Sequence, residues 1–221
     1  MNRVSESSGP SSAEQGSIVV SGTGRVAVQP DVADLRLGVS VSRLTVDEAR
    51  HHAASKMASI LEALTEGGVP KKDIRTFLLS VQPRYDYRDG QPPVLSGYEL
   101  ANVVEVTVRD LARLGDVVDG SLKAGATSMD SLTFRLADPA PAEREARILA
   151  MAEARSRADV LAEAAGILIS GVSSVVEEGA MPPPHPFGKA ERMMMAADVP
   201  TPVESGSLEI AVRVTVSYRT T

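Results

Sequence analysis

A glycine-rich segment near the start of the chain has the spacing of a dinucleotide-binding loop. Residues 22–27 read Gly-Thr-Gly-Arg-Val-Ala, which fits the G-x-G-x-x-A pattern. Such a loop needs a strand before it and a helix after it, because the helix amino end must meet the pyrophosphate. Here Val26 and Val28 continue the alternation of a strand, and Pro30 ends it. We therefore interpret the two glycines as a bulge or a close approach of another backbone.

Histidine and methionine side chains are the next candidates for chemistry. His51 and His52 are neighbours on a predicted helix and point about 100° apart, so they cannot share one metal ion as residues four apart would. Met181, His185 and Met193–Met195 share one segment, and thioether and imidazole ligands together suit Cu(I). Consecutive methionines cannot all face one ion, so we favour a flexible apolar segment that docks on a neighbouring subunit. We expect no metal and no cofactor.

No nucleophile or acid forms a recognisable catalytic pattern. The chain has no cysteine, and no serine lies in a nucleophile-elbow sequence. Several aspartates stand at the ends of predicted elements, where capping explains them. These are Asp31, Asp34, Asp73, Asp110 and Asp138. We therefore predict that the protein is not an enzyme and has no catalytic residue, while an enzyme with an unrecognised acidic site stays an alternative.

The amino-acid composition limits the kinds of partner that the protein can bind and the compartment in which we expect it. The 221 residues include 23 Lys and Arg against 29 Asp and Glu, which gives a net charge of −6. A nucleic-acid binder needs a basic surface and often aromatic stacking, and this chain has only 3% aromatic residues and no tryptophan. No stretch has the length of a membrane span, and no apolar run near the start has the length of a secretory signal. We therefore expect no nucleic-acid partner and no transmembrane segment. We also expect a cytoplasmic location, since a periplasmic or cell-envelope location would require a leader before this start.

Hydrophobic periodicity predicts a repeated order of elements. The first β-α-β-β unit consists of a strand at 31–42, a helix at 45–66 and strands at 74–87 and 97–109. The second consists of a strand at 128–136, a helix at 139–165 and strands at 167–178 and 208–218. A helix at 110–125 joins the two units, and a strand at 17–29 precedes them. We predict an α+β fold of two β-α-β-β units joined by a helix, with antiparallel sheets packed against helices.

The long predicted helix carries alanine at every fourth position. The series is Ala142, Ala146, Ala150, Ala154, Ala158 and Ala162. Small side chains let a sheet or a second helix approach the helix backbone closely, so this face is predicted to be packed.

Two segments fall outside the periodic pattern. Residues 1–16 are poor in apolar side chains and are predicted to form a disordered tail. Residues 179–202 are rich in proline and hold the methionine run, and we predict that this segment is mobile or used for assembly. Residues 17–221 would then form one domain.

Tyrosines mark the candidate interface. A hairpin turn centred near Gln91-Pro92 would place Tyr85 opposite Tyr98 on the two arms. Pro83 cannot donate a ladder hydrogen bond, so it indicates an edge strand, and an unpaired edge invites pairing with another chain. We therefore expect a homo-oligomer. The candidate interface residues are Tyr85, Tyr87, Tyr98, Met193, Met194 and Met195.

Several ordered pieces of the sequence resemble one known family. They include Gly22-Thr23-Gly24 followed by Pro30-Asp31, then Leu37-Gly38-Val39, Asp73-Ile74-Arg75-Thr76, Pro83-Arg84-Tyr85, Gly97-Tyr98 and Val106-Thr107-Val108-Arg109-Asp110-Leu111. Over about residues 17–219 the chain resembles the SIMPL-domain family, also called YggE-like. The resemblance implies an α+β fold, a link to the cell envelope and to defence against oxidative stress, and a kinase-associated signalling role in animals. It also implies large homo-oligomers in some members, and it supplies no catalytic residues.

These observations favour a non-enzymatic, self-assembling SIMPL-domain protein with a stress-related or scaffolding role. A carrier that holds a small ligand or lipid in an apolar cleft between helix and sheet is the alternative from another class. A pocket of several hundred cubic ångströms with convergent polar groups would favour the carrier. A carboxylate with a raised pKa in a cleft would favour the enzyme.

Overall fold

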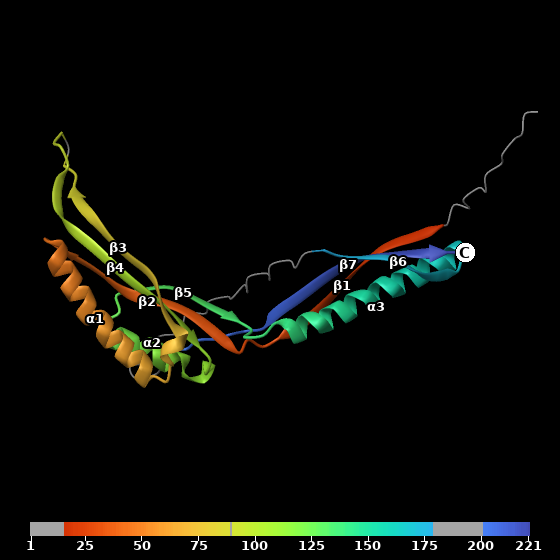
Figure 1. The fold of residues 1–221 in the computed structure, drawn as a ribbon, viewed down its shortest axis with the longest axis horizontal. Helices are drawn as coiled ribbons and strands as arrows, with labels where there is room; N and C mark the ends of the chain where they lie inside the picture. Colours follow the sequence, from red (N-terminus) through yellow and green to blue (C-terminus); the bar gives the residue numbers. More distant parts are fainter. Residues whose placement is uncertain (1–15, 89, 179–200) are drawn as a thin grey trace, which may run out of the picture. The chain divides into compact units, whose positions relative to one another are not determined.

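The computed structural model describes residues 16–88, 90–178 and 201–221 (Figure 1). Within these residues, seven strands form two antiparallel sheets, and three α-helices pack against them. The predicted α+β fold is therefore confirmed. The chain divides into two compact units. The hairpin unit comprises residues 29–138 and 201–208, and the α3 unit comprises residues 16–28, 139–178 and 209–221. The predicted tail up to residue 15 and most of the segment at 179–202 lie outside the described residues.

The hairpin unit holds a four-stranded sheet with the order β3-β4-β2-β5. Its strands are β2 (Val32–Arg43), β3 (Ile74–Asp86), β4 (Val94–Val108) and β5 (Ser128–Arg135). Its helices are α1 (Val46–Glu66) and α2 (Leu114–Lys123), with short 3₁₀ turns at Lys71–Asp73 and Leu111–Arg113. Side-chain caps begin two of these elements: Thr45 accepts from the Glu48 amide, and Asp110 accepts from the Ala112 amide.

The core of this unit lies between the helices and one face of the sheet. Alternate residues of β2 point to that face, because successive side chains of a strand lie on opposite faces. Leu35 and Leu37 are fully buried there beside Val106 and Val104 of β4, and Ile60 of α1 packs into the same core. The residues between them, such as Asp34 and Arg36, therefore point to the opposite face of the sheet.

The α3 unit is a three-stranded sheet covered by one long helix. The strand order is β1-β7-β6, with β1 at Ser17–Val28, β6 at Ile169–Glu178 and β7 at Leu208–Thr220. The helix α3 spans Ala140–Ala165, and all six alanines of the predicted series are buried on its sheet side. The predicted packing of this face is therefore confirmed.

The glycines of the loop-like motif lie in β1 directly under α3. A Cβ atom at Gly22 would stand 2.1 Å from the Ala150 carbonyl oxygen, and one at Gly24 would stand 1.9 Å from that of Ala146. The sequence therefore places glycine on the strand and alanine on the helix where the two backbones approach most closely. This confirms the close approach that we inferred for the motif.

One strand has a different neighbour from the one that the repeated element order suggests. β5 pairs with β2 in the hairpin unit, and β1 takes the place beside β7 in the other sheet. Leu132 lies opposite Leu35, and Phe134 lies opposite Ala33. Alternation in a sequence shows which face of a strand is buried, but it does not show which strand is the neighbour.

Candidate functional site

The β3–β4 hairpin presents the predicted tyrosines at the edge of its sheet. Tyr87 is 78% exposed and Tyr85 is 46% exposed, while Tyr98 is half-buried. β3 is the edge strand, as Pro83 indicated. The predicted pairing of Tyr85 with Tyr98 is wrong, because Tyr98 lies opposite Pro83 and Tyr85 lies opposite Leu95. The register shifts between Arg84 and Tyr85, and sequence spacing cannot reveal such a shift.

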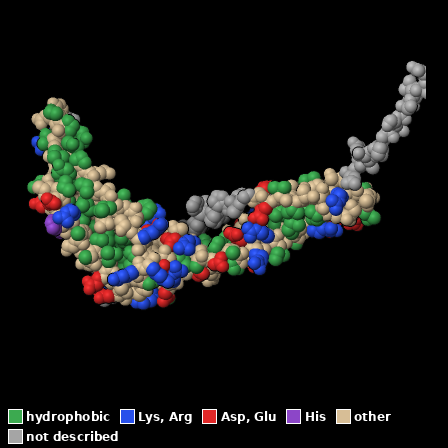
Figure 2. Space-filling model, viewed as in Figure 1, with side chains coloured by type: hydrophobic (Ala, Val, Ile, Leu, Met, Phe, Trp, Pro, Cys, Tyr) green, Lys and Arg blue, Asp and Glu red, His purple; other side chains and the backbone are tan. Residues whose placement is uncertain are grey.

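An apolar surface surrounds these tyrosines on both strands of the hairpin (Figure 2). The arm surface, as we call it, consists of side chains that are each at least 42% exposed: Phe77, Leu78, Leu79, Val81, Tyr85, Tyr87, Val94 and Leu95. No residue of β3 is buried, because the helices pack over β2 and β4 and leave the edge strand uncovered. Leu79 and Val81 lie on the helix side of the sheet, while the Phe77 ring contacts Arg36 on the other side, so the exposed apolar side chains occupy both faces of the hairpin. Exposed apolar area of this extent is typical of a surface that contacts another protein. The other candidate interface residues, Met193–Met195, lie outside the described residues.

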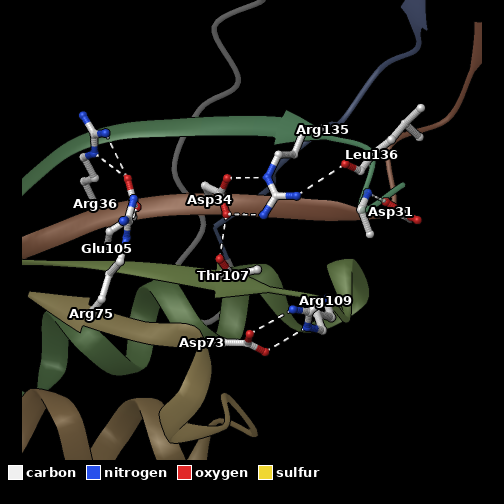
Figure 3. A network of polar contacts seen from close by, with 11 residues as sticks. Asp31, Asp34, Arg36, Asp73, Arg75, Glu105, Thr107, Arg109, Arg135 and Leu136 are labelled. Atoms are coloured by element: carbon white, nitrogen blue, oxygen red, sulfur yellow. Dashed lines mark hydrogen bonds and ion pairs between the residues drawn. The ribbon is translucent and has the colours of Figure 1, made fainter. Parts of the chain in front are cut away.

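The sheet face opposite the helices carries a network of arginines and carboxylates (Figure 3). Glu105 on β4 accepts hydrogen bonds from Arg36 Nε at 2.9 Å and from Arg75 Nε at 2.6 Å. The Arg36 guanidinium also lies 3.7 Å from the centroid of the Phe77 ring, which is a cation–π contact. Hydrogen bonds from Arg75 and Arg36 outweigh desolvation and hold the pKa of Glu105 below its usual value.

Two more carboxylates of this unit are paired with arginine. Asp34 accepts from Arg135 Nε at 2.6 Å and from Thr107 Oγ1 at 2.8 Å. Burial opposes ionisation of Asp34, yet these hydrogen bonds outweigh it and lower its pKa. Asp73 accepts two hydrogen bonds from Arg109, at 2.8 and 2.9 Å, and these lower its pKa.

The network is suited to holding strands together and poorly suited to proton transfer. A carboxylate with a lowered pKa is a weak base, and a general acid needs the opposite shift. The capping role that we expected for Asp34 and Asp73 is wrong, since arginines are their partners, although Asp31 and Asp110 do accept from backbone amides. Sequence reasoning missed this network because its members come from four strands and two loops. The one available signal was the charged Asp34-x-Arg36 pattern on the open face of β2.

A polar groove of about 860 Å³ lies where α1 begins, next to the base of the hairpin. Both helix histidines line it, together with Asp47, Glu48 and Arg84. Among the residues that the structure describes, no three His, Cys, Asp or Glu side chains are arranged to hold a metal ion. His51 instead hydrogen-bonds the Arg50 guanidinium at 3.1 Å.

A second groove of about 800 Å³ lies between α1 and strands β3 and β4. Its apolar lining consists of Met57, Leu61, Ile74 and Val104. Its polar and charged lining consists of Glu62, Thr65, Lys71, Thr76 and Asn102. The Asn102 amide makes no side-chain hydrogen bond with any described residue, although it stands on the helix side of the sheet opposite Val39 and Leu79. The groove therefore has a mixed lining, in which four apolar side chains stand beside charged groups and the free Asn102 amide.

The sequence of the whole folded region matches a family that is described as "SIMPL: Protein of unknown function (DUF541)", over residues 18–218. The chain belongs to the SIMPL family. The match extends over both compact units, so the arm surface, the charged network and the grooves all lie within the family region.

Two kinds of relative are similar to this SIMPL protein over most of its length. The 26 kDa periplasmic immunogenic protein of Brucella melitensis is 31% identical over 208 residues, which are 91% of this chain and 83% of the relative. The uncharacterized protein YggE of Escherichia coli K12 is 33% identical over 196 residues, which are 89% of this chain and 78% of the relative. The resemblance that we inferred from scattered motifs is therefore confirmed.

The expected cytoplasmic location is contradicted by the Brucella relative, which is named a periplasmic protein. Our expectation rested on the lack of an apolar run near the start of the sequence, and such a lack does not determine where a protein resides. Among the helices of the described region, none has the length and apolarity that crossing a membrane requires.

Proposed function

We propose that this SIMPL protein is a non-enzymatic scaffold that assembles with further copies of itself through the arm surface. By similarity to the Brucella relative, we propose that it acts in the periplasm, in a stress-related role. The observation that carries the proposal is the uncovered edge strand β3 with its exposed apolar side chains.

Burial of the arm surface and hydrogen bonding along its edge would both stabilise an assembly. Burying apolar area yields about 25 cal/mol per Å², and the eight exposed side chains on the two faces of the hairpin offer area for such burial. None of the described strands lies beside the outer backbone groups of β3, so a second chain can also supply hydrogen bonds. The lowered pKa values of Asp34, Asp73 and Glu105 support the non-enzymatic part, because such carboxylates stay ionised and paired.

Light scattering on matched variants tests the proposal. Val81→Glu adds a charge to the arm surface, where the side chain is 44% exposed. Leu122→Glu is the control, because Leu122 is 46% exposed on α2 and lies outside the arm surface. We expect the parent and Leu122→Glu to have the same mass, several times that of one chain, and Val81→Glu to have a lower mass. A parent with the mass of a single chain would overturn the proposal.

A second candidate function is favoured by the groove beside Asn102. Its volume lies within the range of small-molecule sites, and its lining combines apolar side chains with the free Asn102 amide and the Lys71 ammonium, which can orient a ligand. The matching ligand is a small amphipathic molecule with an apolar body and one hydrogen-bonding group.

Calorimetry with dodecanoate tests this carrier function. The variant Leu61→Trp fills the groove from a position that is 37% exposed, and Leu122→Trp is the matched control on the other helix. We expect dodecanoate to bind the parent and the control and to bind Leu61→Trp at least tenfold more weakly. Equal binding to all three proteins would place the ligand elsewhere.

A further inference from the structure

The two edge strands of the sheet in the α3 unit, β1 and β6, differ in the hydrogen bonding of their outward backbone groups. At the β1 edge, side chains of α3 form hydrogen bonds with the backbone groups that a neighbouring strand would otherwise bond. Arg157 Nη1 donates to the Ser21 carbonyl oxygen at 2.8 Å, and the Thr23 amide donates to Glu153. Arg157 and Glu153 are themselves an ion pair one helical turn apart. This edge is therefore capped against the addition of a strand.

The β6 edge has no such cap. β6 is the outer strand on the far side of β7, and no described residue donates to or accepts from its outward backbone groups. The Thr220 amide donates to the Gly16 carbonyl oxygen on the β1 side. The backbone groups of successive strand residues point to opposite edges, so those of Ser217 and Thr215 point toward β6. Ser174 and Val176, their partners, point their backbone groups inward. The N–H and C=O groups of Val175 between them consequently point outward.

The side chains of β6 show the same lack of cover. Val172 and Val175 lie opposite the buried Tyr218 and Val216, so they stand on the face that α3 covers, yet they are 43% and 48% exposed. A helix is about 10 Å wide and strands are about 4.8 Å apart, so one helix covers about two of three strands. α3 lies over β1 and the adjacent strand, which leaves these valines half uncovered.

We infer that the β6 edge pairs with the β6 edge of a second copy of this chain, antiparallel and about a two-fold axis. The result is a continuous six-stranded sheet with one α3 helix from each copy on the same face. Val172 and Val175 of both copies then lie in the seam between the two helices. This inference rests on the self-assembly proposed above and adds a second interface on the other unit.

The distribution of charge along β6 selects the antiparallel direction. The stretch from Ile169 to Val176 has no charged residue, and Glu177 and Glu178 follow at its end. Parallel pairing in register would bring four carboxylates together, which destabilises a sheet. Antiparallel pairing sets each acidic end against the uncharged half of the other strand. Glu177 and Glu178 also remain free to keep their arginine partners, Arg147 and Arg213.

A proline at position 175 tests the inference with little effect on the unit itself. Val175→Pro removes an outward N–H and leaves the ladder with β7 intact, because proline is tolerated on edge strands where its N–H would face solvent. Val175→Lys is the second variant, since an edge lysine opposes strand addition without restricting the backbone. Val19→Lys is the control, as Val19 is 61% exposed on the capped β1 strand. Circular dichroism establishes that each variant is folded.

Native mass spectrometry of these variants, alone and combined with Val81→Glu, separates the two interfaces. We expect Val175→Pro and Val175→Lys to leave only dimers joined through the arm surface, Val81→Glu to leave only dimers joined through β6, and the combination to give single chains. The Val19→Lys control should keep the parent mass. If Val81→Glu lowers the mass but both Val175 variants keep the parent mass, the β6 interface is wrong and the proposed self-assembly stands. If neither change lowers the mass, or the parent is a single chain, both are overturned.

Discussion

Gly24 offers a direct test of how closely α3 and β1 approach. In Gly24→Ala the new Cβ would stand 1.9 Å from the Ala146 carbonyl oxygen and 2.6 Å from the Ala150 nitrogen. Both are helix backbone atoms, which cannot rotate away as a flexible side chain can. Ordinary contact begins at 3.4 Å, so the helix must withdraw by about 1.5 Å.

The cost follows from the contacts that this withdrawal opens. A gap of about 0.5–1 Å already loses a quarter to a half of the dispersion energy of each contact. Six buried alanines of α3 share this interface, so the loss extends beyond the substituted position. Overpacking of a core costs about 1–3 kcal/mol, and we expect a decrease near 3 kcal/mol in the free energy of unfolding of the α3 unit.

Thermal and urea unfolding followed by circular dichroism measure the effect. A loss of about 3 kcal/mol in a unit of this size lowers Tm by more than about 10 °C. Gly120→Ala is the matched control, because no atom lies within 4 Å of a Cβ there and the residue is in helix α2. The control should be stabilised by about 0.5–1 kcal/mol. If Gly24→Ala unfolds at the same urea concentration as the parent, the close approach is not a feature of the molecule in solution.

Three further predictions concern packing, pH and metals. Ala158→Leu, at a fully buried position on the sheet side of α3, should destabilise the protein by about 1–3 kcal/mol in urea unfolding, and an unchanged midpoint would show that this helix face is not packed. Asp34, Asp73 and Glu105 have lowered pKa values in the folded protein, so their contribution to stability is complete above about pH 5 and is lost as the pH falls through the folded values. Glu105→Gln should therefore flatten the fall of Tm between neutral and acidic pH, and an identical slope would count against the network. EDTA should leave Tm unchanged, and a decrease that one added metal reverses would reveal a metal requirement for folding.

The element order was predictable because local patterns determine it. The alternation in β2 and β7, the cap at Thr45 and the spacing of the alanines in α3 each indicate one element from its own residues. Strand neighbours were not predictable in this way. The partner of β5 is β2, and Arg135 reaches Asp34 over a separation that no local pattern covers.

The candidate site was predictable only in outline. Pro83 indicated the edge strand and the tyrosines indicated the hairpin, because both signals lie in the local sequence. The exposure of the arm surface depends on which strands α1 covers, and the capped β1 edge depends on Glu153 and Arg157 reaching across from another element. Such contacts between distant segments have no signature in the spacing of residues.

Native mass spectrometry of the full chain at tens of micromolar measures whether the protein assembles with further copies of itself through the arm surface. We expect a defined assembly of several chains, each of 23.3 kDa, and a smaller mass for Val81→Glu. A single species at 23.3 kDa for the parent would contradict this expectation.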